Sequence, residues 1–193
     1  MKQILGIGAI LAIVSLVIFS FISNRKLTPE NYFNWFNSSQ CTVSSWKQSD
    51  FMIMNLNYRT NEYMALSELN GETVSEVNFK AALKNYNCCE HFLLKIFASD
   101  TISEALSYKI INEQEYYERI RFLSSDFGSK VVLVDGSDTL PCTFHHFERT
   151  YKMKPYISVN LIFEKKRQIK NKMSLIIYPT PFNNSEIKFE IID

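Results

Sequence analysis

Alternation of apolar and polar residues predicts β strands over most of the second half of the chain. The clearest case is 156–165, where every second residue from Ile157 to Phe163 is apolar and the residues between them are mostly polar. The segment 130–135 is apolar on both faces, which is typical of a strand inside a sheet. The remaining strands are expected at 51–58, 91–98, 141–151, 172–178 and 187–191. The second half therefore predicts an antiparallel meander.

Helical spacing of apolar residues is confined to the first two thirds of the chain. Each expected helix begins at a residue that caps helices well, or ends near a glycine. The expected helices are 28–36, 61–69, one that starts at a Thr73–Glu76 capping box, and one that runs from Asn112 to Gly128. This order favours an α+β fold with a mostly antiparallel sheet and a few helices over a doubly wound parallel fold.

An uncharged apolar run at residues 4–23 stands apart from this domain. About 20 helical residues span the roughly 30 Å hydrocarbon core of a bilayer. A cleavable signal peptide needs a small residue near its end, where this chain has Phe21, so an uncleaved anchor is favoured over a cleaved signal. Positive charges flank both ends and do not fix the orientation. We expect residues 1–26 to be a membrane anchor or signal segment, and 27–193 a single extracytoplasmic α+β domain.

Composition narrows the classes of function. The net charge is +1, whereas nucleic-acid-binding domains usually carry a clear basic excess. Only 5 glycines are present, which disfavours glycine-rich phosphate loops. We therefore expect no nucleic-acid partner and no cofactor.

The four cysteines are Cys41, Cys88, Cys89 and Cys142. In an oxidising compartment an even number permits disulfides, and four cysteines allow three pairings. A bond between the adjacent Cys88 and Cys89 would be strained, so we expect any bridge to join this pair to Cys41 or Cys142. The alternative is that the cysteines are small buried apolar residues.

The stretch from Leu140 to Phe163 holds the densest group of candidate functional residues. These are His145, His146, Glu148, Arg149 and Pro155. On a strand, His145 and His146 point to opposite faces and cannot readily share a metal, and Glu148 and Arg149 diverge in the same way. No CxxC, HExxH or GxSxG motif is present. We expect a structural corner rather than a catalytic or metal site, with Pro155 marking the start of the next strand.

A basic run follows the strand at 156–165. It consists of Lys165, Lys166, Arg167, Lys170 and Lys172. Such a run could bind an anionic partner or lipid head groups, but a solvated hairpin tip is the more ordinary interpretation.

Two short motifs carry a family resemblance. They are the segment 57–69, NYRTNEYMALSEL, and the segment 146–151, HFERTY, followed by Pro155-Tyr156. Together they resemble a group of uncharacterised short exported proteins and lipoproteins of the Bacteroidetes. The resemblance implies an exported, membrane-attached location and no particular catalytic residues. This chain lacks the lipidation cysteine of the lipoprotein members, so an uncleaved span would take over anchoring.

These observations together favour a single-pass membrane protein whose C-terminal domain is periplasmic. We expect a non-enzymatic interaction or accessory subunit of a cell-envelope assembly, with a protein partner and the membrane as its contacts. A small-molecule or lipid-binding envelope domain is the alternative, and a hydrolase or metalloenzyme is a third possibility.

Overall fold

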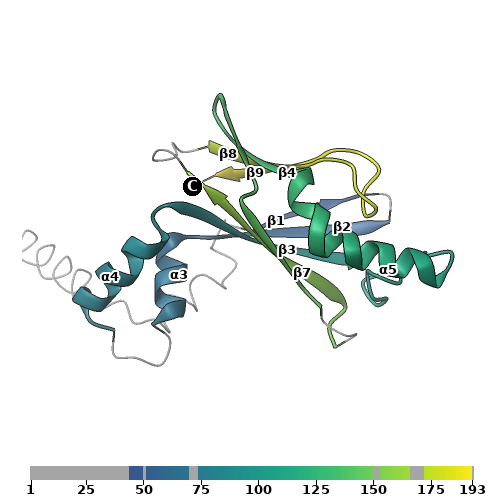
Figure 1. Cartoon of the computed structure of the whole chain (residues 1–193), viewed down its shortest axis with the longest axis horizontal. Coiled ribbons are helices and arrows are strands. Elements are labelled where there is room, and N and C mark those ends of the chain that lie inside the picture. The colour runs from purple at the N-terminus through teal and green to yellow at the C-terminus, as the bar shows by residue number, and fades with distance from the viewer. Residues whose placement is uncertain (1–43, 50, 70–73, 150–152, 166–171, 193) are drawn as a thin grey trace, which may run out of the picture.

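The computed structural model describes residues 44–49, 51–69, 74–149, 153–165 and 172–192. They form an α+β domain with antiparallel sheets and few helices, as predicted (Figure 1). The strands are β1 (Ser44–Gln48), β2 (Met52–Arg59), β3 (Cys89–Ala98), β4 (Val131–Asp135), β5 (Asp138–Pro141), β6 (Phe144–Glu148), β7 (Tyr156–Glu164), β8 (Lys172–Ile177) and β9 (Ile187–Ile192). The helices are α3 (Asn61–Glu68), α4 (Glu76–Tyr86) and α5 (Glu113–Arg121).

The strands belong to two sheets. Sheet A has the order β1-β2-β3-β7-β6, and sheet B has the order β5-β4-β8-β9. All neighbouring strands are antiparallel. Burial of one face of each sheet against the other produces a single core, because each strand presents every second side chain to it.

The core is almost entirely apolar. From sheet A it takes alternate residues of β2, β3 and β7, including Leu56, Leu94 and Leu161, and from sheet B residues such as Leu133 and Phe189. The alternation predicted at 156–165 is confirmed, because the apolar residues from Ile157 to Phe163 at every second position are buried in this core. At about 25 cal/mol per Å² of apolar surface, burial of this kind is the main stabilising term of such a domain.

Helix α5 packs against this core near one edge of the sandwich. Asn112 caps it by accepting a hydrogen bond from the Glu115 backbone N–H, as the sequence predicts. The helix does not end at Gly128. The α-helical part ends at Arg121, then widens into a π turn over Phe122–Asp126 and tightens into a 3-10 turn over Phe127–Lys130 that leads directly into β4.

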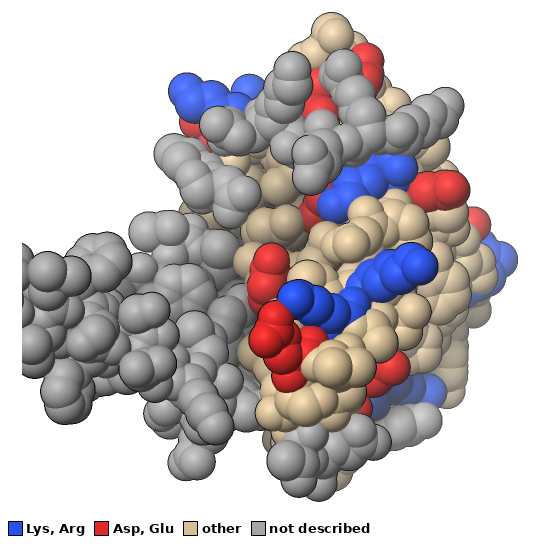
Figure 2. All heavy atoms as spheres, turned by 90° about the vertical axis from the view of Figure 1, so that its left-hand side faces the viewer, with Lys and Arg blue, Asp and Glu red and all other residues tan. Residues whose placement is uncertain are grey.

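Helices α3 and α4 pack on each other and form a small second cluster at the opposite end (Figure 1). Acidic and basic side chains lie close together on this end of the molecule (Figure 2), and Lys80 pairs with Glu76 at 2.6 Å. The capping box of α4 is formed by Ser75 and Asn78. The predicted box at Thr73 and Glu76 is wrong, because Glu76 is already the first helical residue.

The predicted meander is also wrong. The strand expected at 141–151 is the shorter β6 of sheet A, and Pro141 instead ends β5, an unpredicted strand of sheet B, so the chain changes sheets at Cys142-Thr143. Strand β1 was not predicted, because its sequence SSWKQ has no apolar alternation.

The expected anchor at 4–23 and the expected helix at 28–36 lie outside the described residues. Among those that the structure describes, no helix is long and apolar enough to cross a membrane.

Candidate functional site on the open face of sheet A

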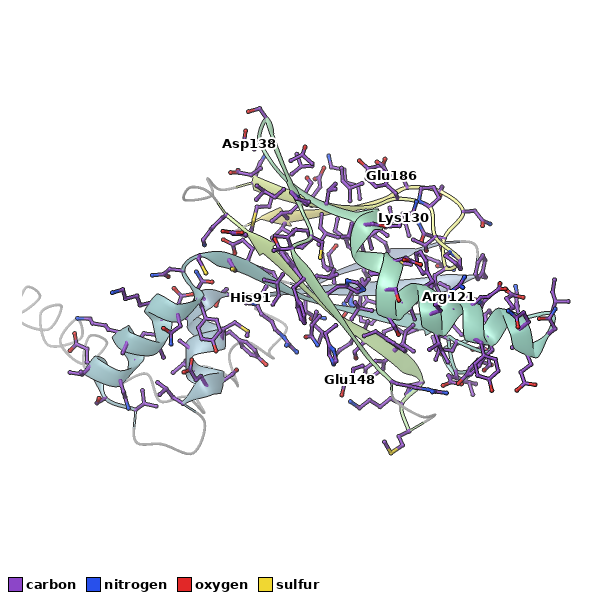
Figure 3. All side chains as sticks on the ribbon, in the orientation of Figure 1. His91, Arg121, Lys130, Asp138, Glu148 and Glu186 are labelled. Atoms are coloured by element: carbon purple, nitrogen blue, oxygen red, sulfur yellow. The ribbon has the colours of Figure 1, made fainter. Side chains whose placement is uncertain are left out.

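The face of sheet A that points away from sheet B is the candidate site. Antiparallel pairing places Asn57, Leu93, Asn160 and His146 side by side across four strands. The neighbouring row runs through Asn55, Lys95, Ser158 and Glu148. These residues alternate with the core residues on the same strands, so the register that builds the core also assembles this surface. Glu148 projects on the side of sheet A remote from sheet B (Figure 3).

A groove of about 550 Å³ lies along these two rows. Its lining comes from β2, β3, β6, β7 and the turn before β7. The lining residues are Arg59, Leu93, Lys95, His146, Glu148, Lys154, Tyr156, Ser158 and Asn160. A volume of this size is within the usual range for ligand sites, which is roughly 300–1,000 Å³.

Positive charge dominates the lining of the groove. Arg59, Lys95 and Lys154 face a single carboxylate, that of Glu148. Both lysines lie over the ring of Tyr156, with Nζ to centroid distances of 5.2 Å for Lys95 and 5.7 Å for Lys154. Cation–π contacts of this kind hold the ammonium groups above the groove without neutralising them. The groove therefore attracts negatively charged groups.

Hydrogen bonds order one side of the groove. Arg59 Nη1 donates to Asn160 Oδ1 at 3.1 Å. Asn57 Nδ2 donates to Asn55 Oδ1 at 2.6 Å, and Asn55 in turn donates to Ser44 Oγ at 2.8 Å. This network fixes the β1–β2 side of the open face, while Ser158 in the floor is only 3% exposed. The floor is thus preorganised before any ligand arrives.

Aromatic rings border the groove on the side of β1. The ring of Phe97 lies 5.6 Å from Trp46 and 5.0 Å from Tyr156, measured between centroids. Trp46 is 59% exposed, which is unusual for so large an apolar side chain. Aromatic residues such as Trp are enriched in protein interfaces relative to the rest of the surface.

The α3–α4 pair covers the other end of the open face. Tyr86 packs edge-on against His91 with a centroid distance of 5.6 Å. Burial lowers the pKa of His91 from its usual value, and nearby Arg59 and Lys165 act in the same direction. His91 Nε2 has no hydrogen-bond partner among the described residues. The neutral imidazole belongs to the packing under α4 rather than to the groove.

The groove contains a serine, a histidine and a carboxylate, the residue types of a catalytic triad, but not the hydrogen bonds that would make them one. Ser158, His146 and Glu148 share the surface, but within the described part of the chain no hydrogen bond joins Ser158 to His146 or His146 to Glu148. Nucleophilic catalysis requires those two bonds to activate the hydroxyl. No group of three or more potential metal ligands occurs in the described ranges. The arrangement suits recognition better than nucleophilic catalysis.

The structure divides the candidate corner residues between two faces. His146 and Glu148 line the groove, whereas His145 lies on the other face of β6 and bonds the backbone oxygen of Leu123 at 3.1 Å. Arg149 donates to the hydroxyl of Tyr116 on α5 at 3.2 Å. Pro155 directly precedes β7, as predicted. His145 and Arg149 therefore connect β6 to α5 and the π turn that follows it, whereas His146 and Glu148 face the groove.

The cysteines and the basic run are placed differently from expectation. Cys88, Cys89 and Cys142 are free thiols, so the predicted bridge is not formed among these three, and Cys41 lies outside the described residues. Lys165 is no solvated tip residue, because its Nζ contacts Glu90 Oε1 at 2.5 Å with both side chains largely buried. Lys172 is exposed on β8. Lys166, Arg167 and Lys170 lie outside the described residues.

Sequence reasoning missed most of the groove. Arg59, Lys95, Lys154 and Asn160 sit in or beside strands where a polar residue indicates only the solvent side. A signal was available in β3, where Lys95 is the one charged residue in the otherwise apolar run 92–98, but only the pairing of β3 with β7 brings it to Ser158.

Comparison with protein-family models, curated proteins and solved structures finds no match to this chain.

Proposed function

We propose that this chain is a membrane-anchored, non-enzymatic accessory subunit of a cell-envelope assembly. In this proposal it holds a protein partner on the open face of sheet A. The observation that carries the proposal is the groove, in which three cations surround a preorganised polar floor next to an aromatic row that ends at the exposed Trp46. The apolar segment 4–23 supports the membrane attachment, and the resemblance to exported Bacteroidetes proteins supports the periplasmic location.

The partner segment that fits this groove carries carboxylates. Lys95 and Lys154 present ammonium groups at one end, and Arg59 is held by Asn160 at the other. Charge complementarity of this kind steers association and excludes partners of the wrong sign. The exposed ring of Trp46 would add an apolar anchor beside these charges.

The test is recovery of the partner from native membranes with matched charge reversals. The full chain is extracted in mild detergent and captured as the parent, as Lys95→Glu and as Lys188→Glu. Lys188 is the control, because it is an exposed cation on β9, on the opposite side of the sandwich. We expect one protein to co-purify stoichiometrically with the parent and with Lys188→Glu, and to be lost from Lys95→Glu.

Equal recovery of that protein with all three forms would contradict the proposal. A second candidate, a small-molecule-binding domain, is favoured by the volume of the groove, about 550 Å³. It predicts that a small anionic compound, and no protein, is released when the purified parent is denatured. The polar floor disfavours a lipid as the occupant.

A further inference from the structure

Two consecutive cysteines lie with their sulfur atoms in contact. Cys88 is in the turn after α4, and Cys89 is the first residue of β3. Adjacent side chains of a continuous strand point to opposite faces, which would separate the two thiols. Here Sγ of Cys88 lies 3.2 Å from Sγ of Cys89. The turn, and not the strand, therefore sets the orientation of Cys88.

The surrounding backbone holds the pair in this arrangement. The carbonyl oxygen of Cys88 accepts a hydrogen bond from the Lys165 N–H at 2.9 Å, and Cys89 pairs with Glu164 across β3 and β7. The Cys88 thiol also lies 3.9 Å from the carbonyl oxygen of Asn85 at the end of α4. The chain is thus held on both sides of the cysteine pair, by the end of α4 before Cys88 and by the strand pairing of sheet A after it.

We propose that Cys88 and Cys89 form a reactive dithiol site, which a disulfide-bearing oxidant converts into a bond between these two adjacent residues. The contact between the sulfur atoms carries this inference, because the second step of such an oxidation requires one sulfur to reach the other. It replaces the sequence-based expectation of a bridge to Cys41 or Cys142. A bond between adjacent residues is strained, and strain makes a disulfide easier to reduce. The inference does not rest on the proposed function of the groove. It concerns a separate place, at the junction between α4 and sheet A.

The reaction proceeds by two exchanges. The thiolate of Cys88 attacks one sulfur of the oxidant, which forms a mixed disulfide and releases the first thiolate of the oxidant. The thiolate of Cys89 then attacks Cys88 Sγ, breaks the mixed disulfide and releases the second. The protein loses two protons and two electrons, and the oxidant disulfide becomes two thiols.

Exposure assigns the order of the two cysteines. Cys88 is exposed and Cys89 is half-buried, so an external oxidant reaches Cys88 first. Burial, followed by the hydrogen bond to Cys88, raises the pKa of the Cys89 thiol to about 11. Cys89 is therefore the poorer initial nucleophile, and proximity to Cys88 compensates for this in the second exchange.

Tryptic mapping of the full chain tests the site directly. Cleavage after Lys84 and Lys95 releases residues 85–95, a peptide that contains both cysteines and neither of the others. The reduced, detergent-solubilised protein is treated with oxidised glutathione, alkylated and digested. We expect this peptide to be two hydrogen atoms lighter than its dithiol form and to carry no alkyl group.

Matched serine variants complete the test. Cys142→Ser should leave the yield of the oxidised, unalkylated peptide 85–95 unchanged, because Cys142 takes no part in the reaction. Cys88→Ser should abolish formation of this oxidised peptide and leave at most a glutathione adduct on Cys89. The proposal is overturned if both cysteines of the parent remain alkylatable, if a glutathione adduct persists on the pair, or if the peptide is cross-linked to the one containing Cys41 or Cys142.

Discussion

The two faces of sheet A differ although they are built from the same strands. On the inner face, the core side chains of β2, β3 and β7 are at most 8% exposed, and the value of 8% belongs to Tyr58. On the outer face, the intervening residues include Asn55, Lys95 and Ser158. The period of two along a strand lets one sequence satisfy two demands, stability on one face and recognition on the other.

Strand β3 shows this division most clearly. Leu94 is fully buried in the core, and its neighbour Leu93 lies in the lining of the groove. The two residues have the same chemistry and differ only in the face that they occupy. Substitutions on the inner face should therefore strongly destabilise the domain, and substitutions of solvent-accessible side chains on the outer face should affect mainly binding.

The largest expected effect is the loss of a core side chain. Leu94→Ala should lower the free energy of unfolding by about 2–5 kcal/mol, because it leaves a cavity between the sheets. Leu93→Ala is the matched control and should cost less than about 1 kcal/mol, since Leu93 is only half-buried and its loss leaves no enclosed cavity. Urea unfolding of both variants measures the difference, and equal costs would refute the division between the faces.

The buried ion pair at the end of the core should give the next largest effect. Glu90 accepts hydrogen bonds from the Tyr58 hydroxyl at 2.6 Å and from Lys165 Nζ at 2.5 Å. Lys165→Met should cost about 3 kcal/mol, because it leaves the buried carboxylate without its cation. Lys172→Met removes an exposed lysine instead and should be nearly neutral. A cost for Lys165→Met as small as that of the control would show that the pair is not structural.

The contact between β6 and the helical segment predicts a smaller, coupled effect. A Cβ added at Gly128 would lie 2.6 Å from Nδ1 of His145. Gly128→Ala should therefore cost about 1–3 kcal/mol through overpacking. In a His145→Ala background the same substitution should cost much less, and a double-mutant cycle measures the coupling. Strictly additive costs would mean that the clash is not the cause.

Titration of His91 should give the smallest effect. Its pKa is lowered in the folded state, so the unfolded chain binds the proton more readily. The contribution of His91 to stability is then complete above about pH 6.5 and is lost as the pH falls from there toward the lowered folded pKa. His91→Phe should flatten this part of the pH profile of the melting temperature. An unchanged profile would contradict the assignment of a neutral His91.

The sequence predicted the local elements better than their assembly. Alternation in β2, β3 and β7 identified the inward residues, and the cap at Asn112 was correct, because these signals depend only on neighbours along the chain. The division into two sheets was missed, since the change of sheet at Cys142-Thr143 has no local signature. The groove was missed for the same reason. Lys95 is far from His146 and Ser158 in sequence, and only the register of three strands brings them together.

The most direct test of the central claim fills the groove without touching the core. Leu93→Trp places a bulky side chain on the floor between Asn57 and Asn160. We expect recovery of the partner from native membranes to fall at least about tenfold, equivalent to about 1.4 kcal/mol of binding free energy. The melting temperature should stay within a few degrees of the parent, about the shift that 1 kcal/mol produces in a domain of this size. Undiminished recovery from a stably folded Leu93→Trp protein would show that the open face of sheet A is not the binding surface.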